Sequence, residues 1–491
     1  MEPLPSKLAA ALVFLASGAV LVLETVALRL VGPYIGVTLQ VTSSVIGMAL
    51  GAIAYGAWLG GFLADRYDPR KLIPPALVLA GIATAVTLPI VRYAGEVLRG
   101  EAAGGILLLT ALAVFVPAGL LSAVTPLVVK LQLGDLARTG RVVGRLSSIG
   151  TLGGITATLA TGFVLVAALS TSAIIVSLAV ALGLSGIGLW LYLRRRVAMP
   201  LTRTGAALAG LGLLGAGLST VAPNPCDIET AYHCATVTSD PARGTGRTLI
   251  LNSANHSYVD LADPRHLEFE YTQWFGAVAD VMAPEGQRLD ALHLGGGGFT
   301  MPRYLTATRP RTDNDVYEID GGLVDLARRE LGLRTGPDLT AVVGDARVLV
   351  TARPEDSADL VVGDAFGHLV VPWHLATREM VVEIQRVLRP QGIYTQNVID
   401  YPPLRFIRAE MATVADVFPH VLLIGEPAAL AGETGANFVI VASDAPLPLD
   451  ALRARVGPGI TVLEGDELAD LVGSAPVLTD EYAPVDQLLA R

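Results

Sequence analysis

Residues 289–300 read LDALHLGGGGFT, and this stretch decides the fold of the second half of the chain. The apolar run over 290–294 has the composition of a buried β-strand, and it leads directly into four glycines at 295–298. Glycines at such a point let the backbone turn tightly and approach a ligand closely. The stretch therefore predicts the first strand and turn of a nucleotide-binding type of α/β sheet.

Strand and helix patterns continue to alternate up to residue 443. Further apolar runs predict strands at 316–319, 339–343, 360–362, 393–398, 421–424 and 438–441, and helical stretches between them include 321–331 and 376–389. This order predicts a parallel, doubly wound sheet, which binds its ligands at the carboxyl ends of the strands. Three predicted strands end within two residues of an acidic residue, namely Glu318, Asp345 and Asp364. We expect these three carboxylates to face one crevice.

The first 222 residues differ in composition from the rest of the chain. They contain seven apolar segments, each near the ~20 residues that a helix needs to cross a bilayer, at 8–31, 42–63, 71–94, 102–130, 143–169, 171–193 and 205–222. They carry 15 Lys and Arg against 7 Asp and Glu, whereas residues 223–491 carry 20 Arg, no Lys and 38 Asp and Glu. We predict four parts: a transmembrane helical domain (1–222), a small β-domain (223–288), a Rossmann-like catalytic domain (289–443) and a C-terminal appendage (444–491).

The distribution of Lys and Arg predicts how the spans are oriented. With a cytoplasmic N-terminus, the inside segments hold 12 of these residues and the outside loops hold only Arg92 and Arg99. Seven spans then place the C-terminal domain on the extracytoplasmic side of the cell inner (plasma) membrane. Cys226 and Cys234 follow the last span, and in an oxidising compartment they could form a disulfide. Two unrelated buried thiols are the alternative.

Two segments of the first half resemble the major facilitator transporters. Residues 60–71, GGFLADRYDPRK, resemble the loop after the second helix of that family. Residues 140–162 are similar to its fifth helix, with small residues at Gly150, Gly153 and Gly154 that let helix backbones approach closely in lipid. The resemblance covers about half of a full transporter, and it implies fold ancestry more than transport activity.

Residues 227–443 resemble the polyamine aminopropyltransferases, the spermidine synthase family. The resemblance rests on the order and spacing of ETAY (229–232), LNS (251–253), EFEY (268–271), the glycine run, EID (318–320), GDA (344–346), DLVVGD (359–364), LRPQG (388–392) and Gln396. The implied fold class is a multi-pass α-helical membrane domain of about seven spans, a small β-domain and an α/β Rossmann-like domain with the methyltransferase fold.

Carried over by position, the resemblance implies roles for the matched residues. Glu318 would bind the ribose and Asp345 the adenine of the cosubstrate, decarboxylated S-adenosylmethionine. The complete cofactor-binding set would be Gly295, Gly296, Gly297, Glu318, Asp345 and Ala346. Asp364 would be the general base, because an ammonium group must lose a proton before it can act as a nucleophile. Tyr271 would flank the aminopropyl chain.

Two departures from the family pattern remove carboxylates. The family's glycine motif reads GGGDGG, and its Asp helps to hold the transferred amino group, whereas this chain has Gly298 there. The family's DSSD motif reads DAFG at 364–367, so its second Asp is missing. Phe299 and Phe366 are expected to make the pocket more apolar. The substrate-binding candidates are His256, Asp260, Glu268, Gln396 and Asp400, and a structural role is the alternative for His256.

Two alternative functions stay open, and the net charge of the second half indicates which partners to expect. Methyl transfer from S-adenosylmethionine is one alternative, and a non-catalytic domain that binds polyamines or nucleosides and is coupled to transport is another. The net charge of −18 over 223–491 favours cationic polyamines by long-range attraction, although acidic surfaces also aid solubility. It argues against nucleic acid as a partner. No metal-ligand spacing is present, and the related enzymes imply a homo-oligomer such as a dimer.

Overall fold

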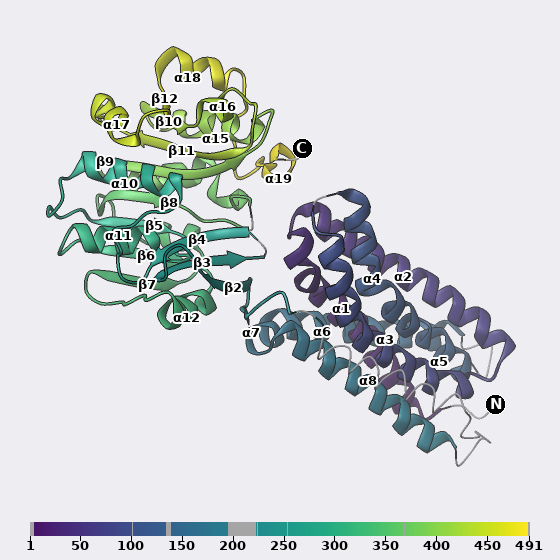
Figure 1. Cartoon of the computed structure of the whole chain (residues 1–491). Helices are drawn as coiled ribbons and strands as arrows, with labels where there is room; N and C mark the ends of the chain where they lie inside the picture. The colour runs from purple at the N-terminus through teal and green to yellow at the C-terminus, as the bar shows by residue number, and fades with distance from the viewer. Residues whose placement is uncertain are drawn as a thin grey trace. The chain divides into compact units, whose positions relative to one another are not determined.

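The computed structural model describes residues 4–100, 102–133, 139–194, 222, 224–252, 254–367 and 369–489. The chain forms two compact units, Met1–Glu229 and Thr230–Arg491, and each is considered by itself (Figure 1). The first unit is helical and the second combines two sheets with helices, as the fold class predicted from the sequence requires. The four-part division at 222, 288 and 443 stays a prediction.

The first unit is built from long apolar helices. Their bounds are α1 (Ser6–Ile35), α2 (Leu39–Arg66), α3 (Pro69–Val97), α4 (Ala103–Ser122), α5 (Val124–Gln132), α6 (Thr139–Ala160), the π-helical η2 (Thr161–Leu165), α7 (Val166–Ala168) and α8 (Thr171–Leu193). Among the described residues, six helical stretches are long and apolar enough to cross a membrane, with α4–α5 and α6–α7 each counted as one. The seventh predicted span, 205–222, falls outside the described residues except for Ala222.

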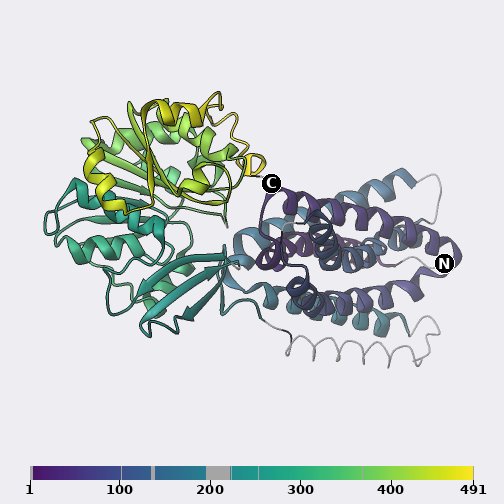
Figure 2. The same cartoon turned by 45° about the horizontal axis from the view of Figure 1, so that its top comes forward.

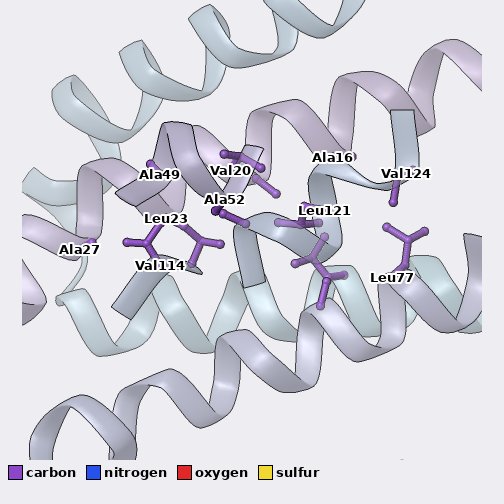
Figure 3. Close-up of a cluster of buried hydrophobic side chains, with 14 of the residues drawn as sticks. Ala16, Val20, Leu23, Ala27, Ala49, Ala52, Leu77, Val114, Leu121 and Val124 are labelled. Carbon is purple, nitrogen blue, oxygen red and sulfur yellow. The ribbon is translucent and has the colours of Figure 1, made fainter. Parts of the chain in front are cut away.

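Small residues allow these helices to pack closely. A Cβ on Gly56 of α2 would lie 2.1 Å from the carbonyl oxygen of Gly119 in α4, and one on Gly153 of α6 would lie 2.4 Å from that of Phe14 in α1. Gly150, Gly153 and Gly154 are buried, as the predicted close approach of backbones requires. Between the helices, apolar side chains such as Leu23, Val114 and Leu121 form one buried cluster (Figure 3).

The second unit begins with a small antiparallel sheet. Its strands are β2 (Cys234–Ser239), β3 (Gly246–Leu251) and β4 (Ala254–Asp260), and the two-residue strand β1 (Ile228–Glu229) lies at the boundary between the units. Ala235 pairs with Leu251 and Thr248 pairs with Tyr258. The two cysteines, Cys226 and Cys234, are disulfide-bonded.

The main sheet has eight strands in the order β12-β10-β11-β9-β8-β5-β6-β7. Their bounds are β5 (Ala291–Leu294), β6 (Asn314–Glu318), β7 (Leu339–Val343), β8 (Ala358–Gly363), β9 (Leu388–Asp400), β10 (His420–Gly425), β11 (Ala436–Ser443) and β12 (Thr461–Leu463). All seven strands predicted between 289 and 443 are present. Strands β9, β8, β5, β6 and β7 are parallel.

The expectation of a wholly parallel sheet is wrong at one side. Strand β11 is antiparallel to both β9 and β10, and β12 is antiparallel to β10. The reason is the short connection from Gly425 to Ala436, since a parallel crossover needs a dozen or more residues. Strand β10 nevertheless runs in the same direction as β8 and β9, so its carboxyl end lies at the same edge of the sheet.

Helices cover both faces of the main sheet (Figures 1 and 2). One face packs against α10 (Glu270–Met282), α11 (Thr300–Thr308) and α17 (Leu449–Val456). The other packs against α13 (Ala346–Thr351), α14 (Arg378–Val387), α15 (Arg405–Ala415) and α18 (Gly465–Val472). Successive residues of the central strands enter alternate clusters, such as Leu360 and Val361 of β8, as expected of a sheet buried on both faces. Because helices cover both faces of the sheet, a ligand is expected at the carboxyl ends of the strands.

Candidate active site

The glycine turn after β5 lies directly against the end of β8. Gly295 has a φ of +95°, and a Cβ there would lie 2.4 Å from the backbone oxygen of Asp364. Only glycine adopts this conformation and leaves room for this contact. On its other side the turn meets β4, because the Gly298 amide donates to Ser257 Oγ (3.0 Å). The turn is therefore fixed between the small sheet and the main sheet.

Glu318, at the end of β6, holds the glycine turn in place. Its Oε2 accepts hydrogen bonds from the backbone amides of Gly296 (2.7 Å) and Gly297 (3.1 Å), and its Oε1 accepts one from the amide of Asp320 (2.9 Å). The side chain is buried. Three backbone donors thus fix both carboxylate oxygens next to the turn.

Asp364, directly after β8, lies between two polar side chains. The Tyr271 hydroxyl donates to Oδ2 (3.4 Å), and the Asn397 amide donates to Oδ1 (3.0 Å). Asn397 is itself oriented by Asn437, which donates to its Oδ1 (3.0 Å). Burial raises the pKa of Asp364 to about 6, although these two hydrogen bonds lower it. A carboxylate with this pKa is suited to exchange a proton near neutral pH.

Two adjoining pockets meet at Asp364. The larger pocket measures about 460 Å³ and is lined by residues that include Glu268, Glu270, Tyr271 and Glu426. The smaller pocket measures about 80 Å³ and is lined by residues that include Gly295, Gly297, Glu318, Asp345 and Ala346. Asp364, His256 and Phe366 line both pockets. The three strand-end carboxylates predicted from the sequence therefore do surround one pocket.

The smaller pocket also contains polar groups from two loops. Asp345 accepts a hydrogen bond from the backbone amide of Arg347 (2.8 Å) at the start of α13, and its Oδ2 lies 3.4 Å from His374 Nε2. His233 lines the same pocket, and its Nδ1 lies 2.9 Å from Oδ2 of the fully buried Asp320. Asp320 thereby orients the His233 ring, and the sequence contained no pattern that pointed to this contact.

Three of the predicted substrate-binding residues line neither of these two pockets. Asp260 is buried against Arg243 and accepts backbone hydrogen bonds from Ala262 (2.8 Å) and Asp263 (3.0 Å). Burial opposes its ionisation, but hydrogen bonds from Arg243, Thr245 and the two amides outweigh burial and lower its pKa. Asp260 therefore stabilises the turn that follows β4.

Asp400 and Gln396 also have partners inside the fold. Asp400 is fully buried and accepts hydrogen bonds from the amides of Tyr401 (2.7 Å) and Ile407 (2.8 Å). Gln396 donates to Glu410 (2.8 Å), whose pKa burial raises to about 8. Phe299 is fully buried and lines neither of the two pockets, so the expectation that it makes the pocket more apolar is wrong. Phe366 does line it.

The residues that sequence reasoning missed lie next to ones that it chose. On β9 the neighbour of Gln396, Asn397, is the side chain that reaches Asp364, because successive residues of a strand point to opposite faces. Glu270 is the third residue of the EFEY motif, between the chosen Glu268 and Tyr271, and it lines the larger pocket. Among the described residues, no group of three or more His, Cys, Asp and Glu is arranged to hold a metal ion.

No family model matches the chain. A polyamine aminopropyltransferase from Vibrio vulnificus (strain CMCP6) is 26% identical over 220 residues, which are 42% of this chain and 71% of the relative. A probable spermidine synthase from Corynebacterium glutamicum ATCC 13032 is 27% identical, with a TM-score of 0.49 over 52% of this chain and 95% of that structure.

A methyltransferase structure gives a weaker match. Human methyltransferase-like protein 13 in complex with SAH is 17% identical, with a TM-score of 0.32 over 44% of this chain and 96% of that structure. The sequence match to the Vibrio enzyme covers 42% of this chain. The C-terminal half of this chain is therefore homologous to the polyamine aminopropyltransferases, the spermidine synthases.

Proposed function

We propose that the second unit is a membrane-bound aminopropyltransferase, which moves an aminopropyl group from decarboxylated S-adenosylmethionine to a polyamine acceptor. The observation that carries the proposal is the position of Asp364, a buried carboxylate with a raised pKa where two pockets meet. One pocket would take the nucleoside and the other the acceptor. The homology to polyamine aminopropyltransferases supports the assignment.

Asp364 would act as the general base. It takes a proton from the acceptor ammonium, and the freed nitrogen lone pair attacks the aminopropyl carbon bonded to the sulfonium. The new N–C bond forms as the C–S bond breaks. The electron pair of the C–S bond stays on sulfur, which gives neutral methylthioadenosine. Asn397 and Tyr271 keep both oxygens of Asp364 oriented during this step. Burial and the nearby Asp364 raise the pKa of Tyr271, so this hydroxyl remains a donor.

The smaller pocket has suitable groups for a nucleoside. Glu318 would accept from the ribose hydroxyls, Asp345 would accept from the adenine amino group, and Ala346 would contact the ring. The 80 Å³ of this pocket is below the ~300–1,000 Å³ usual for small-molecule sites. Binding therefore requires its walls to separate, and the side chains shared with the larger pocket are His256, Asp364 and Phe366.

On the acceptor side we assign His256 and Glu268, which line the larger pocket, to substrate binding. A structural role would fall to Asp260, Asp400 and Gln396, whose hydrogen bonds would stabilise the segments around the site. The carboxylates that the family carries at the positions of Gly298 and Gly367 would be missing here, and their loss would weaken binding of a polycation. The larger pocket must then bind its substrate's charge with other groups.

The first unit would anchor the enzyme in the inner membrane with the second unit on the extracytoplasmic side. Six apolar helices support the membrane anchor. The extracytoplasmic side rests on the predicted seventh span, 205–222, together with the asymmetry of Lys and Arg. The disulfide bonding of Cys226 and Cys234 also supports it, because disulfides persist in oxidising compartments. Since adenosyl sulfonium compounds are made in the cytoplasm, this orientation requires that the cosubstrate be delivered across the membrane.

The proposal is tested with full-length protein in detergent. The protein is incubated with decarboxylated S-adenosylmethionine and a panel of amines, and methylthioadenosine is measured by mass spectrometry. We expect product with a polyamine acceptor and none with Asp364→Asn. S-adenosylhomocysteine formed from S-adenosylmethionine, with no methylthioadenosine, would instead favour methyl transfer. Saturable nucleoside binding without turnover, unchanged by Asp364→Asn, would favour the non-catalytic alternative.

A further inference from the structure

The smaller pocket lies between two segments that are separate in the chain. Asp345 and Ala346, at the start of α13, form one wall, and the other wall includes His374 and Leu375 of the 3₁₀-helix η3 (Trp373–Leu375). The pocket measures about 80 Å³, so the space for a nucleoside depends on how far apart these two walls lie. A contact that joins the walls therefore affects how the pocket binds.

Arg347 joins the two walls. Its backbone amide donates a hydrogen bond to Asp345 (2.8 Å) in the first wall. Its Nη1 donates to the carbonyl oxygen of His374 (2.8 Å) in the second wall and to Oγ1 of Thr377 (2.9 Å), which is fully buried. Because the backbone and the side chain of one residue reach different walls, the side-chain conformation of Arg347 fixes the distance between them.

Asp480 determines that side-chain conformation. Nη2 of Arg347 donates to its Oδ2 (2.7 Å), and the Thr377 hydroxyl donates to its Oδ1 (2.7 Å). The three side chains thus form a closed ring of hydrogen bonds. Burial opposes the ionisation of Asp480, but the hydrogen bonds from Thr377 and Arg347 outweigh burial and lower its pKa. The carboxylate is therefore charged near neutral pH, as an ion pair with Arg347 requires.

The segment that carries Asp480 is attached to α14 and α15. The fully buried Leu478 accepts a hydrogen bond from the backbone amide of Arg378 (2.8 Å) and donates one to Thr413 Oγ1 (2.8 Å). The backbone amide of Asp480 donates to Glu379 (3.0 Å). These contacts give the carboxylate a fixed position, so it can hold Arg347 in one rotamer, whereas water in its place would not.

We propose that Asp480 is a positioning residue for the nucleoside pocket: through Arg347 it fixes the separation of the two walls and places Asp345 against the adenine amino group. This inference rests on the proposed function and gives a role to the predicted appendage (444–491). Asp480 lines neither pocket, so it would act on the nucleoside only through Arg347.

Nucleoside binding, rather than turnover, tests this inference. Isothermal titration of the full-length protein compares wild type with Asp480→Asn, which keeps the size of the side chain but replaces one accepting oxygen with an amide nitrogen. We expect the variant to bind methylthioadenosine at least about tenfold more weakly, as for loss of one hydrogen bond to a charged group. Methylthioinosine has an oxygen in place of the amino group that Asp345 would accept from. Its affinity should fall less, so the preference for adenine should decrease.

Matched variants separate positioning from a general loss of stability. Glu481→Gln removes the same charge from the exposed neighbour of Asp480 and should change neither affinity. Arg347→Gln should weaken methylthioadenosine binding at least as much as Asp480→Asn, and combining the two should add nothing further, because both act through one contact.

Three results would overturn the inference: an equal loss of affinity for both nucleosides, additive losses in the double variant, or unchanged affinity in Asp480→Asn. A wild-type protein that does not bind methylthioadenosine would overturn both this inference and the proposed function. Absence of aminopropyl transfer is a separate result that bears on the proposed function alone, because these titrations need no turnover.

Discussion

Replacing Asp364 with asparagine is expected to slow turnover strongly and, at neutral pH, to make the fold more stable. Burial raises the pKa of Asp364 from its ordinary 3.8 to about 6, and one pKa unit corresponds to about 1.4 kcal/mol. The charged carboxylate therefore lowers the free energy of unfolding by at most about 3 kcal/mol. Asparagine fills the same space, keeps an oxygen for Asn397 and carries no charge.

The pH dependence of this gain follows from the sign of the shift. Between about pH 4 and pH 6 the folded protein keeps a proton on Asp364 that the unfolded chain has released, so wild-type stability falls as pH rises through this window. The asparagine variant has no such loss. Its advantage should be below about 1 kcal/mol at pH 4 and should approach about 3 kcal/mol above pH 6.

Two measurements on the full-length protein check this prediction. Methylthioadenosine formation should fall by about 10²- to 10⁴-fold, as is usual for loss of a general base. Urea unfolding in detergent, followed by near-ultraviolet circular dichroism at pH 4 and pH 7.5, should show the pH-dependent gain. Asp416→Asn, on the surface beside Arg378, is the control and should change neither. Turnover near the wild-type rate, or a stability difference independent of pH, would refute the reasoning.

Three further experiments test the packing of the glycine turn, the role of Glu318 and the membrane topology. Gly295→Ala should lower the free energy of unfolding by about 2–4 kcal/mol in thermal unfolding, because strain at positive φ adds to a clash with the end of β8. The control Gly286→Ala has a similar φ but open space around the added Cβ, and it should lower this free energy by only about 1 kcal/mol. Equal losses in the two variants would contradict the clash. Glu318→Gln should weaken methylthioadenosine binding at least about tenfold in calorimetry, because the new amide nitrogen would face the backbone N–H donors of the glycine turn. An unchanged affinity for methylthioadenosine would show that the hydrogen bonds from the turn to Glu318 do not shape the site. After reduction of intact cells, an impermeant thiol reagent should label Cys226 and Cys234, whereas protection until lysis would contradict the extracytoplasmic placement.

Much of the fold could be predicted because its signals are local. Each apolar run between 289 and 443 became a strand, since the period and length of such runs follow from strand geometry alone. The grouping of Glu318, Asp345 and Asp364 around one pocket was also predictable, because parallel strands bring their carboxyl ends to one edge. The direction of β11 was missed, since it depends on the length of a connection rather than on the strand's own residues.

The sequence by itself determined the order of strands and helices, the glycine turn and the identity of Asp364 as the central carboxylate. Only the tertiary structure decided which other acids are available to a substrate. Asp260 and Asp400 are occupied by backbone amides, whereas Glu270 and Glu426, on α10 and after β10, meet in the larger pocket. The physical reason is that a carboxylate's role depends on which donors surround it, and those donors come from segments far apart in the chain.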